Sequence, residues 1–156
     1  MHHIFGTDNF GRDIFSRVMQ GLGTTLVIST SVVLFSTVAG VLLGAFTGYF
    51  GGILDEILMR ITDAVNGFPS ILLTLVIISL LGKGRQNVII ALGIVFIPSF
   101  VRIVRGEFLR LRDADYIKRA RLMGVSRLRI LFVHILPNIF SVLLVSVMIG
   151  FNNCLL

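Results

Sequence analysis

A basic stretch at residues 116–138, YIKRARLMGVSRLRILFVHILPN, has the residue types and spacing most indicative of a function. It reads as a short basic helix, a glycine turn at Gly124 and a Leu-Pro pair at the head of an apolar run. Residues 102–129 hold nine of the fourteen Lys and Arg residues and three acids, so this segment carries the whole net charge of +6. This pattern favours docking at a membrane surface through charge and shape, and it does not indicate a catalytic reaction.

Sites for ATP, metal ions and disulfides are not predicted. The G-x4-G-K-[ST] pattern that cradles phosphates does not occur, and Gly82-Lys83-Gly84 lacks its spacing. We therefore expect no cofactor in this chain, no ATPase activity of its own and no enzymatic function. Cys154 is the single cysteine, which excludes an internal disulfide and a cysteine metal site, and we interpret it as a packing residue.

Composition indicates an integral membrane protein. Hydrophobic residues make up 55% of the chain, charged residues 14%, and the mean hydropathy is +0.95, which is far from the balance of a soluble domain. Residues 1–23 are polar and mixed, without the basic and then apolar order of a signal peptide. We expect an extracytoplasmic segment there, followed by an all-α, polytopic transmembrane helical bundle at residues 24–156.

Four spans are predicted from apolar runs that can cross about 30 Å of hydrocarbon. They cover residues 24–49, 54–81, 88–104 and 128–156. Because Lys and Arg favour the cytoplasmic side, the loop at about residues 105–127 is placed in the cytoplasm, and counting crossings back places residues 1–23 outside. A polar segment reaches that side when a preceding hydrophobic helix delivers it. We therefore expect a fragment of a longer chain, lacking an upstream membrane helix.

Glycines and prolines predict where the spans pack and bend. Three small residues recur at every fourth position of the first span and would form one face that a neighbouring backbone can approach: Gly40, Gly44 and Gly48. Prolines remove a backbone hydrogen bond, so helix kinks are predicted at the three prolines of the chain, Pro69, Pro98 and Pro137.

The short basic helix is expected at residues 114–123. Asp113 or Asp115 is predicted to cap its start, Gly124 to end it, and Ser126 to cap the helix that follows. Its apolar face is predicted from residues at i, i+4 and i+7: Tyr116, Ala120 and Met123.

Three interpretations of this stretch compete. The plainest is a solvated, positively charged loop. Ala120, Gly124, Val125 and Ser126 also match the A-x3-G-V-S core of a helix-turn-helix, but the second helix would be too apolar for a DNA groove, so no nucleic-acid partner is expected. The third, a short helix docked in a pocket of a cytoplasmic partner, accounts for both the amphipathic pattern and the rigid exit into the next span.

Two motifs resemble those of bacterial ABC importer permeases. The basic stretch resembles their E-A-A-x3-G-x9-I-x-L-P loop, and the residues in register are Ala120, Gly124, Leu136 and Pro137. The departures are Lys118, Arg119 and His134, which stand where Glu, Ala and Ile are usual. Residues 6–17, GTDNFGRDIFSR, resemble the G-T-D-x2-G-R-D-x2-S-R signature of dipeptide, oligopeptide and nickel permeases, which points to their C-type subunit.

The resemblance implies a multi-pass permease subunit of an ATP-driven di- or oligopeptide importer in the bacterial inner membrane. A nickel or other small-solute permease and, in a different class, an ion channel subunit are the alternatives. The implied partners are two ABC ATPase subunits that bind the ATP, a second permease subunit, an extracytoplasmic substrate-binding protein and membrane lipid. Further membrane helices before and after this chain are implied as well.

The resemblance also assigns ATPase coupling to one run of residues. These are Asp115, Tyr116, Ile117, Lys118, Arg119, Ala120, Arg121, Leu122, Met123 and Gly124. Outside that run, Asp63 is costly at membrane depth and has two open roles, a helix cap at the interface or a polar contact in the translocation path.

Overall fold

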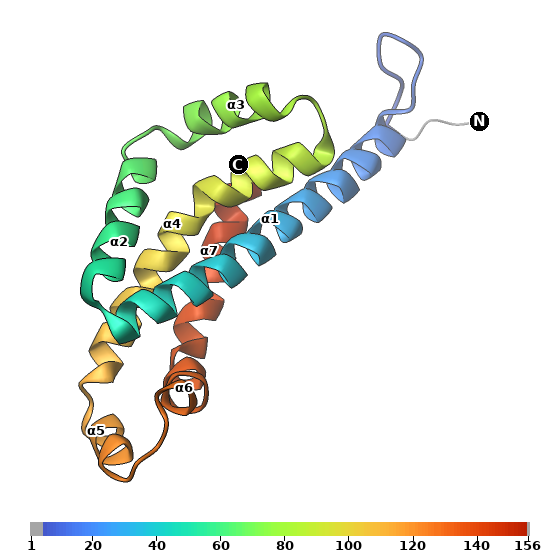
Figure 1. Ribbon diagram of the computed structural model, residues 1–156. Helices are drawn as coiled ribbons and strands as arrows, with labels where there is room; N and C mark the ends of the chain where they lie inside the picture. Colours follow the sequence, from blue (N-terminus) through green and yellow to red (C-terminus); the bar gives the residue numbers. More distant parts are fainter. Residues whose placement is uncertain (1–4, 156) are drawn as a thin grey trace.

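The computed structural model describes residues 5–155 and is built from helices (Figure 1). Their bounds are α1 Ile14–Phe50, α2 Gly52–Asn66, α3 Ser70–Leu81, α4 Arg85–Arg112, α5 Asp115–Leu122, α6 Arg127–Arg129, the π-helix η1 Ile130–Ile135, the 3-10 helix η2 Leu136–Ile139, and α7 Phe140–Leu155. Three helical stretches are long and apolar enough to cross a membrane: α1, α4 and the run Arg127–Leu155 from α6 to α7. The pair α2 and α3 makes a fourth crossing if it is one broken span. These helices confirm the predicted all-α, polytopic bundle.

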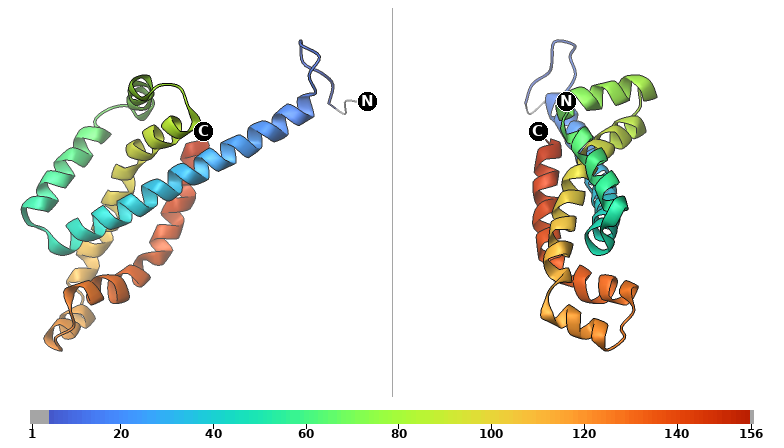
Figure 2. Two further views of the ribbon diagram at one scale, coloured as in Figure 1. Left: turned by 45° about the vertical axis from the view of Figure 1, so that its right-hand side comes forward. Right: turned by 60° about the vertical axis from the view of Figure 1, so that its left-hand side comes forward.

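Helix α1 begins at Ile14, ten residues before the predicted start of the first span. Asp13 explains the early start, because its side chain accepts a hydrogen bond from the Ser16 N–H at 3.1 Å and caps the helix. With 37 residues the helix is about 55 Å long, which exceeds the hydrocarbon thickness of about 30 Å. The boundary proposed between residues 23 and 24 therefore lies inside a continuous helix, whose N-terminal turns project beyond the other helices (Figure 2).

The predicted second span is two helices rather than one. Helices α2 and α3 meet at an angle of 96°. Pro69 lies in the break, where it has no N–H to donate and restricts the backbone of the residue before it. The other two predicted kink sites differ: Pro98 lies within the continuous helix α4, and Pro137 lies in η2, where the last span changes from π to 3-10 geometry.

Helices α1 and α4 form the main packing pair. A Cβ on Gly44 would lie 2.8 Å from the Val101 carbonyl oxygen, and one on Gly48 would lie 2.9 Å from that of Arg105. Gly40 faces Phe100 in the same way. Because no side chain stands between the backbones, the hydroxyl of Ser36 reaches α4 and donates to the Gly93 carbonyl at 2.9 Å.

Candidate functional site

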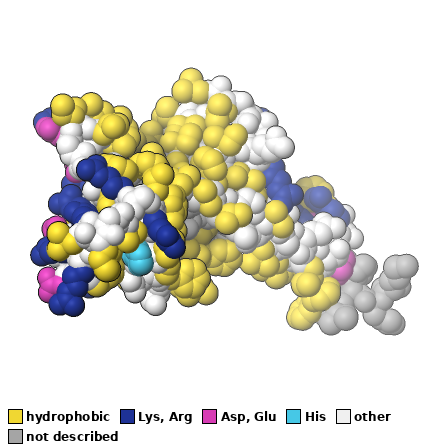
Figure 3. Space-filling model, turned by 60° about the horizontal axis from the view of Figure 1, so that its bottom comes forward, with side chains coloured by type: hydrophobic (Ala, Val, Ile, Leu, Met, Phe, Trp, Pro, Cys, Tyr) yellow, Lys and Arg dark blue, Asp and Glu magenta, His cyan; other side chains and the backbone are white. Residues whose placement is uncertain are grey.

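Helix α5 and the start of the last span lie together at one end of the molecule, next to the C-terminal ends of α1 and α4 (Figures 1 and 2). We call residues 115–139, from α5 to η2, the elbow. In Figure 3 Lys and Arg side chains gather over this end, whereas most of the flank behind it is hydrophobic. This distribution is the one expected where a membrane protein emerges into the cytoplasm.

The C-terminal end of α5 is fixed by Gly124. This residue has φ +78, and its N–H donates to the Arg121 carbonyl at 3.0 Å. The N–H of Val125 donates to the Ala120 carbonyl at 3.1 Å. These two bonds make a Schellman motif, in which a left-handed residue after the helix satisfies its last carbonyls. The predicted role of Gly124 as the residue that ends the helix matches this geometry.

The start of α5 differs from the prediction. Ala114 is its N-cap residue, and among the described residues no side chain caps the helix, so neither Asp113 nor Asp115 has the predicted role. Asp115 instead lies in the first turn, where a carboxylate favours the helix dipole, and 3.8 Å from the Lys118 ammonium. Ser126 is the N-cap residue of α6, again without a side-chain cap bond in this part of the chain.

The predicted apolar face of α5, which is Tyr116, Ala120 and Met123, is divided in the fold. Ile117 and Ala120 are buried against the protein itself, at 0% and 7% exposure. Tyr116 is half-exposed, while Leu122 and Met123 are 88% and 77% exposed. Ala120 therefore holds α5 to its own chain. Of the other residues assigned to coupling, five are exposed: Asp115, Lys118, Arg119, Arg121 and Gly124.

One hydrophobic cluster joins α5 to three membrane-spanning elements. Its members are Ala45 and Tyr49 from α1, Val104 and Phe108 from α4, Ile117 and Ala120 from α5, and Ile130, Leu131, Ile135 and Ile139 from η1 and η2. Helix α5 is therefore packed directly against the ends of α1, α4 and the last span.

Two polar contacts that the sequence did not reveal reinforce the cluster. The guanidinium of Arg121 lies 5.3 Å from the centre of the Tyr49 ring, a cation–π arrangement between α5 and α1. The side-chain amide of Asn138 donates to the His134 carbonyl at 2.7 Å and to the Tyr116 hydroxyl at 3.2 Å. Asn138 thus ties α5 to the irregular turn of the last span, next to Pro137.

Helix α2 is held to α4 by two ion pairs, each between residues at least 39 positions apart. Arg105 binds both carboxylate oxygens of Asp55, at 2.5 and 2.7 Å, and this pair is largely buried. Arg102 binds Asp63 at 2.7 Å in an exposed position. Asp63 does not have the predicted role of a helix cap, because it lies within α2 and its side chain pairs with Arg102 of α4.

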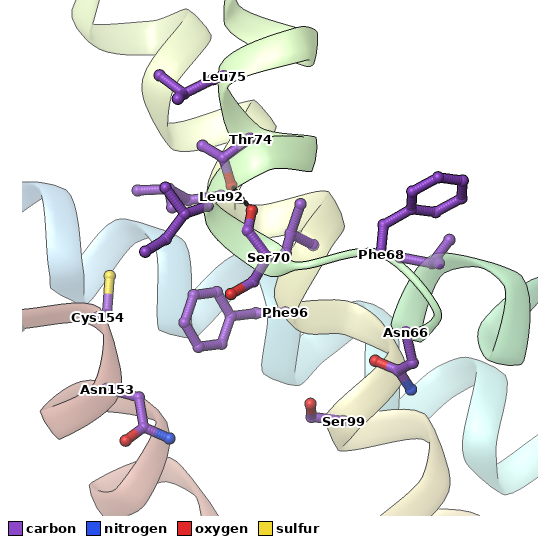
Figure 4. Close-up of a pocket in the computed structure, with 13 residues that line it drawn as sticks. Asn66, Phe68, Ser70, Thr74, Leu75, Leu92, Phe96, Ser99, Asn153 and Cys154 are labelled. Carbon is purple, nitrogen blue, oxygen red and sulfur yellow. Dashed lines mark hydrogen bonds between the residues drawn. The ribbon is translucent and has the colours of Figure 1, made fainter.

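A cavity of about 810 Å³ lies between the break of α2 and α3, helix α4 and the end of α7 (Figure 4). Its polar lining is Asn66, Ser70, Thr74, Ser99 and Asn153. Phe68 and Phe96 add aromatic surface, and Figure 4 shows Phe96 between Ser70 of α3 and the α7 residues. Within residues 5–155 no three His, Cys, Asp or Glu side chains are grouped as metal binding would need. Most of the remaining lining is aliphatic.

The second motif forms a compact loop before α1. Asp8 accepts hydrogen bonds from the N–H groups of Phe10 and Arg12, both at 2.9 Å, and pairs with the side chains of Arg12 and Arg17. The backbone N–H of Arg12, followed by that of Phe10 and the charge of Arg17, lowers the pKa of the Asp8 carboxyl below its ordinary value. Residues 1–4 of the predicted extracytoplasmic segment, and Leu156 at the end of the last span, lie outside the described residues.

Comparison with known proteins agrees with both motifs. Residues 40–156 match the family described as binding-protein-dependent transport system inner membrane component. The dipeptide transport system permease protein of Alkalihalophilus pseudofirmus is 40% identical over 154 residues, which is 99% of this chain and 51% of that protein. The glutathione transport system permease protein of Pectobacterium atrosepticum is 42% identical over 152 residues, 96% of this chain and 50% of that protein.

The chain thus spans about half the length of the curated relatives it matches. Its apolar helices and these permease relatives make it a multi-pass membrane protein. The family match covers the elbow, the cavity and the packed helices from residue 40 onward, and together with the relatives it confirms the resemblance to peptide permeases. The chain belongs to the family of binding-protein-dependent transport system inner membrane components.

Proposed function

We propose that this chain is the membrane-spanning permease part of an ATP-driven importer of di- or oligopeptides in the bacterial inner membrane. ATPase subunits on the cytoplasmic side would act on α5, a second permease subunit would complete the pathway, and a binding protein would deliver the peptide from outside. The names of the relatives support the peptide class, because they include dipeptide and glutathione permeases.

The observation that carries the proposal is the shared hydrophobic cluster of the elbow. Because α5 packs into the same cluster as α1, α4 and the last span, a partner that moves α5 moves the ends of all three. Rigid-body tilting of spans around a fixed site is a known way to alternate access to the two sides of a membrane. The exposed Leu122 and Met123 side chains, with the basic rim around them, are available to a partner pocket.

The cavity beside the α2–α3 break supports a peptide solute. Its volume lies in the range of small-molecule sites, about 300–1,000 Å³. Asn66 and Asn153 offer amide donors and acceptors that match a peptide backbone, and the serine and threonine hydroxyls add to them. In the proposed complex the second permease subunit covers this open side.

Uptake of a labelled dipeptide into cells that express the complete transporter tests the proposal. We expect uptake to fall to background when the ATPase subunits carry a substitution that abolishes ATP hydrolysis, with the permease present in the membrane at the same level. A channel would continue to conduct the solute without hydrolysis, so uptake that persists would refute the proposal.

A further inference from the structure

A second cavity, of about 570 Å³, lies at the elbow between the end of α1, the end of α4, α5 and α6. Its lining is Tyr49, Phe50, Arg112, Asp113, Arg121, Val125 and Arg127. Three arginines face one aspartate, which leaves this cavity with a net charge of +2. Arg121 belongs to the run assigned to ATPase coupling, whereas Arg112 and Arg127 lie outside it.

The arginines are only partly neutralised. Arg112 is 3.7 Å from the Asp113 carboxylate, which is longer than a hydrogen bond, and it also interacts with the charge of Asp55. Arg121 contacts the face of Tyr49, which carries no net charge. Within residues 5–155, Arg121 and Arg127 form no ion pair. Three guanidinium groups that converge in one concave site suit a phosphate, which guanidinium binds through paired N–H donors.

Helix stabilisation explains only part of this arrangement. Arg112 and Arg121 lie in the last turns of α4 and α5, where a cation favours the helix dipole. Arg127 lies at the start of the run Arg127–Leu155, where the dipole disfavours a cation. Stabilisation of its own helix therefore does not account for the charge of Arg127.

The surface next to the cavity indicates which kind of anion. Leu42, Phe46 and Phe50 follow one face of α1 at every fourth residue, and each is 46–48% exposed. The Phe46 and Phe50 rings stack with their centres 5.8 Å apart. This apolar strip begins at the cavity and runs into the membrane-spanning part of α1. A lipid presents both a phosphate for the arginines and an acyl chain for the strip, whereas an acidic side chain of a partner protein uses only the arginines.

We propose that this cavity binds the phosphate headgroup of an anionic lipid from the cytoplasmic leaflet, with one acyl chain along Leu42, Phe46 and Phe50. Basic pockets between membrane helices on the cytoplasmic side are suited to such headgroups. The bound lipid would fill the space between α1 and α5 and brace the elbow against the membrane. The inference depends on the chain spanning a membrane and is independent of the solute that is transported.

Native mass spectrometry of the complete transporter tests the site, after reconstitution in a mixture of phosphatidylglycerol and phosphatidylcholine and release in mild detergent. We expect retained phosphatidylglycerol to fall about fivefold for Arg127→Gln and about 25-fold for Arg121→Gln with Arg127→Gln, from the usual contribution of one basic residue at an anionic surface. The matched control, Lys118→Gln with Arg129→Gln, removes the same charge from exposed positions outside the cavity and should leave retention unchanged.

Each alternative has its own outcome. Displacement of the lipid by millimolar inorganic phosphate, together with normal retention in Phe46→Gln, would show a site for a soluble anion and overturn the lipid proposal. Loss of ATPase subunits from the double variant with lipid retention intact would show a protein contact and overturn it as well. If the double variant does not assemble, lipid retention in the single variant Arg127→Gln, which changes an exposed position, still tests the proposal.

Discussion

Asn138 adds a side-chain hydrogen bond between the last span and α5 to their shared hydrophobic cluster. Replacing it by Leu keeps its size and removes the bonds to the Tyr116 hydroxyl and the His134 carbonyl. Each is worth about 1 kcal/mol, so we expect a looser elbow and fewer peptides imported per ATP hydrolysed. The ratio of uptake to ATPase activity in proteoliposomes measures this.

Tyr116→Phe is the matched variant, because it removes only the contact between α5 and Asn138. It should lower the ratio by a smaller factor. A ratio equal to that of the wild type in both variants would show that Asn138 does not transmit motion.

Asp8 makes the loop before α1 sensitive to acid. Its pKa is lowered in the folded protein, chiefly by the Arg12 N–H, so the stability that it contributes is present above its unfolded pKa of about 3.9 and is lost as the pH falls through the lower folded value. We expect hydrogen exchange at Phe10 and Arg12, corrected for intrinsic rates, to accelerate below about pH 4.

In Asp8→Asn the exchange at these amides should be faster at neutral pH and show no such step. A step that persists in this variant would assign the acid sensitivity to another group.

At the residue scale the sequence predicts backbone requirements better than side-chain partners. Gly124 could be placed because a left-handed residue after a helix has a local signature. The roles of Asn138 and Ala120 depend on which face of α5 meets the cluster, and that face is set by tertiary contacts. The predicted apolar face of Tyr116, Ala120 and Met123 is divided, because Ala120 is buried together with Ile117 whereas Tyr116 and Met123 stay exposed.

At the scale of the helices, the close contact of α1 and α4 determines the structure. Gly44→Ala would place a methyl group 2.8 Å from the Val101 carbonyl and from Val104, so one helix must shift. We expect a loss of about 1–3 kcal/mol, measured by thermal unfolding of the purified complex.

Gly23→Ala in the same helix is the control, since no described atom lies within 4 Å of its added methyl group. It should be neutral or stabilise the helix slightly. Equal destabilisation by both changes would argue against α1–α4 packing through this glycine face.

The ion pair of Asp55 and Arg105 fixes α2 to α4. Asp55→Asn leaves a largely buried guanidinium without its carboxylate, and we expect a loss of about 2–3 kcal/mol, below the value for full burial because Arg105 is 28% exposed. Adding Arg105→Gln should recover much of that loss, since no unpaired charge then remains. Thermal unfolding of the single and double variants gives the coupling energy.

Asp63→Asn, in the exposed pair with Arg102, should cost less than about 1 kcal/mol. An equal loss of stability in Asp63→Asn and Asp55→Asn would show that the two ion pairs do not differ in strength because of their burial.

At the element scale the sequence predicts helices and apolar runs but not their breaks or full lengths. The all-α class follows from composition and run length. The 96° bend at Pro69 exceeds a kink because Gly67 and Phe68 also leave the helix, and its size depends on α3 packing against α4. The first turns of α1 were not predicted, because residues 14–23 are not apolar enough to mark a span. The Asp13 cap was nevertheless visible in the sequence.

At the scale of the whole molecule, the basic end, the shared cluster and the cavity form one arrangement. In the proposed mechanism the elbow receives a force outside the membrane, the packed pair of α1 and α4 carries it, and the cavity beside α2, α4 and α7 opens or closes around a solute. The concentration of basic residues at the elbow, on which its predicted cytoplasmic placement rests, was readable from the sequence. The cluster was not, because its members are spread from Ala45 to Ile139.

Crosslinking between α5 and the ATPase subunits tests the central claim most directly. In a Cys154→Ser background, a cysteine at the exposed Leu122 should crosslink to an ATPase subunit of the assembled transporter, and the yield should change when ATP is bound. A cysteine at the buried Ile117, on the face that packs against α1 and α4, should not crosslink. Absence of crosslinking at Leu122 and at the neighbouring Met123, in a complex that still hydrolyses ATP, would contradict the docking of α5 and the account built on it.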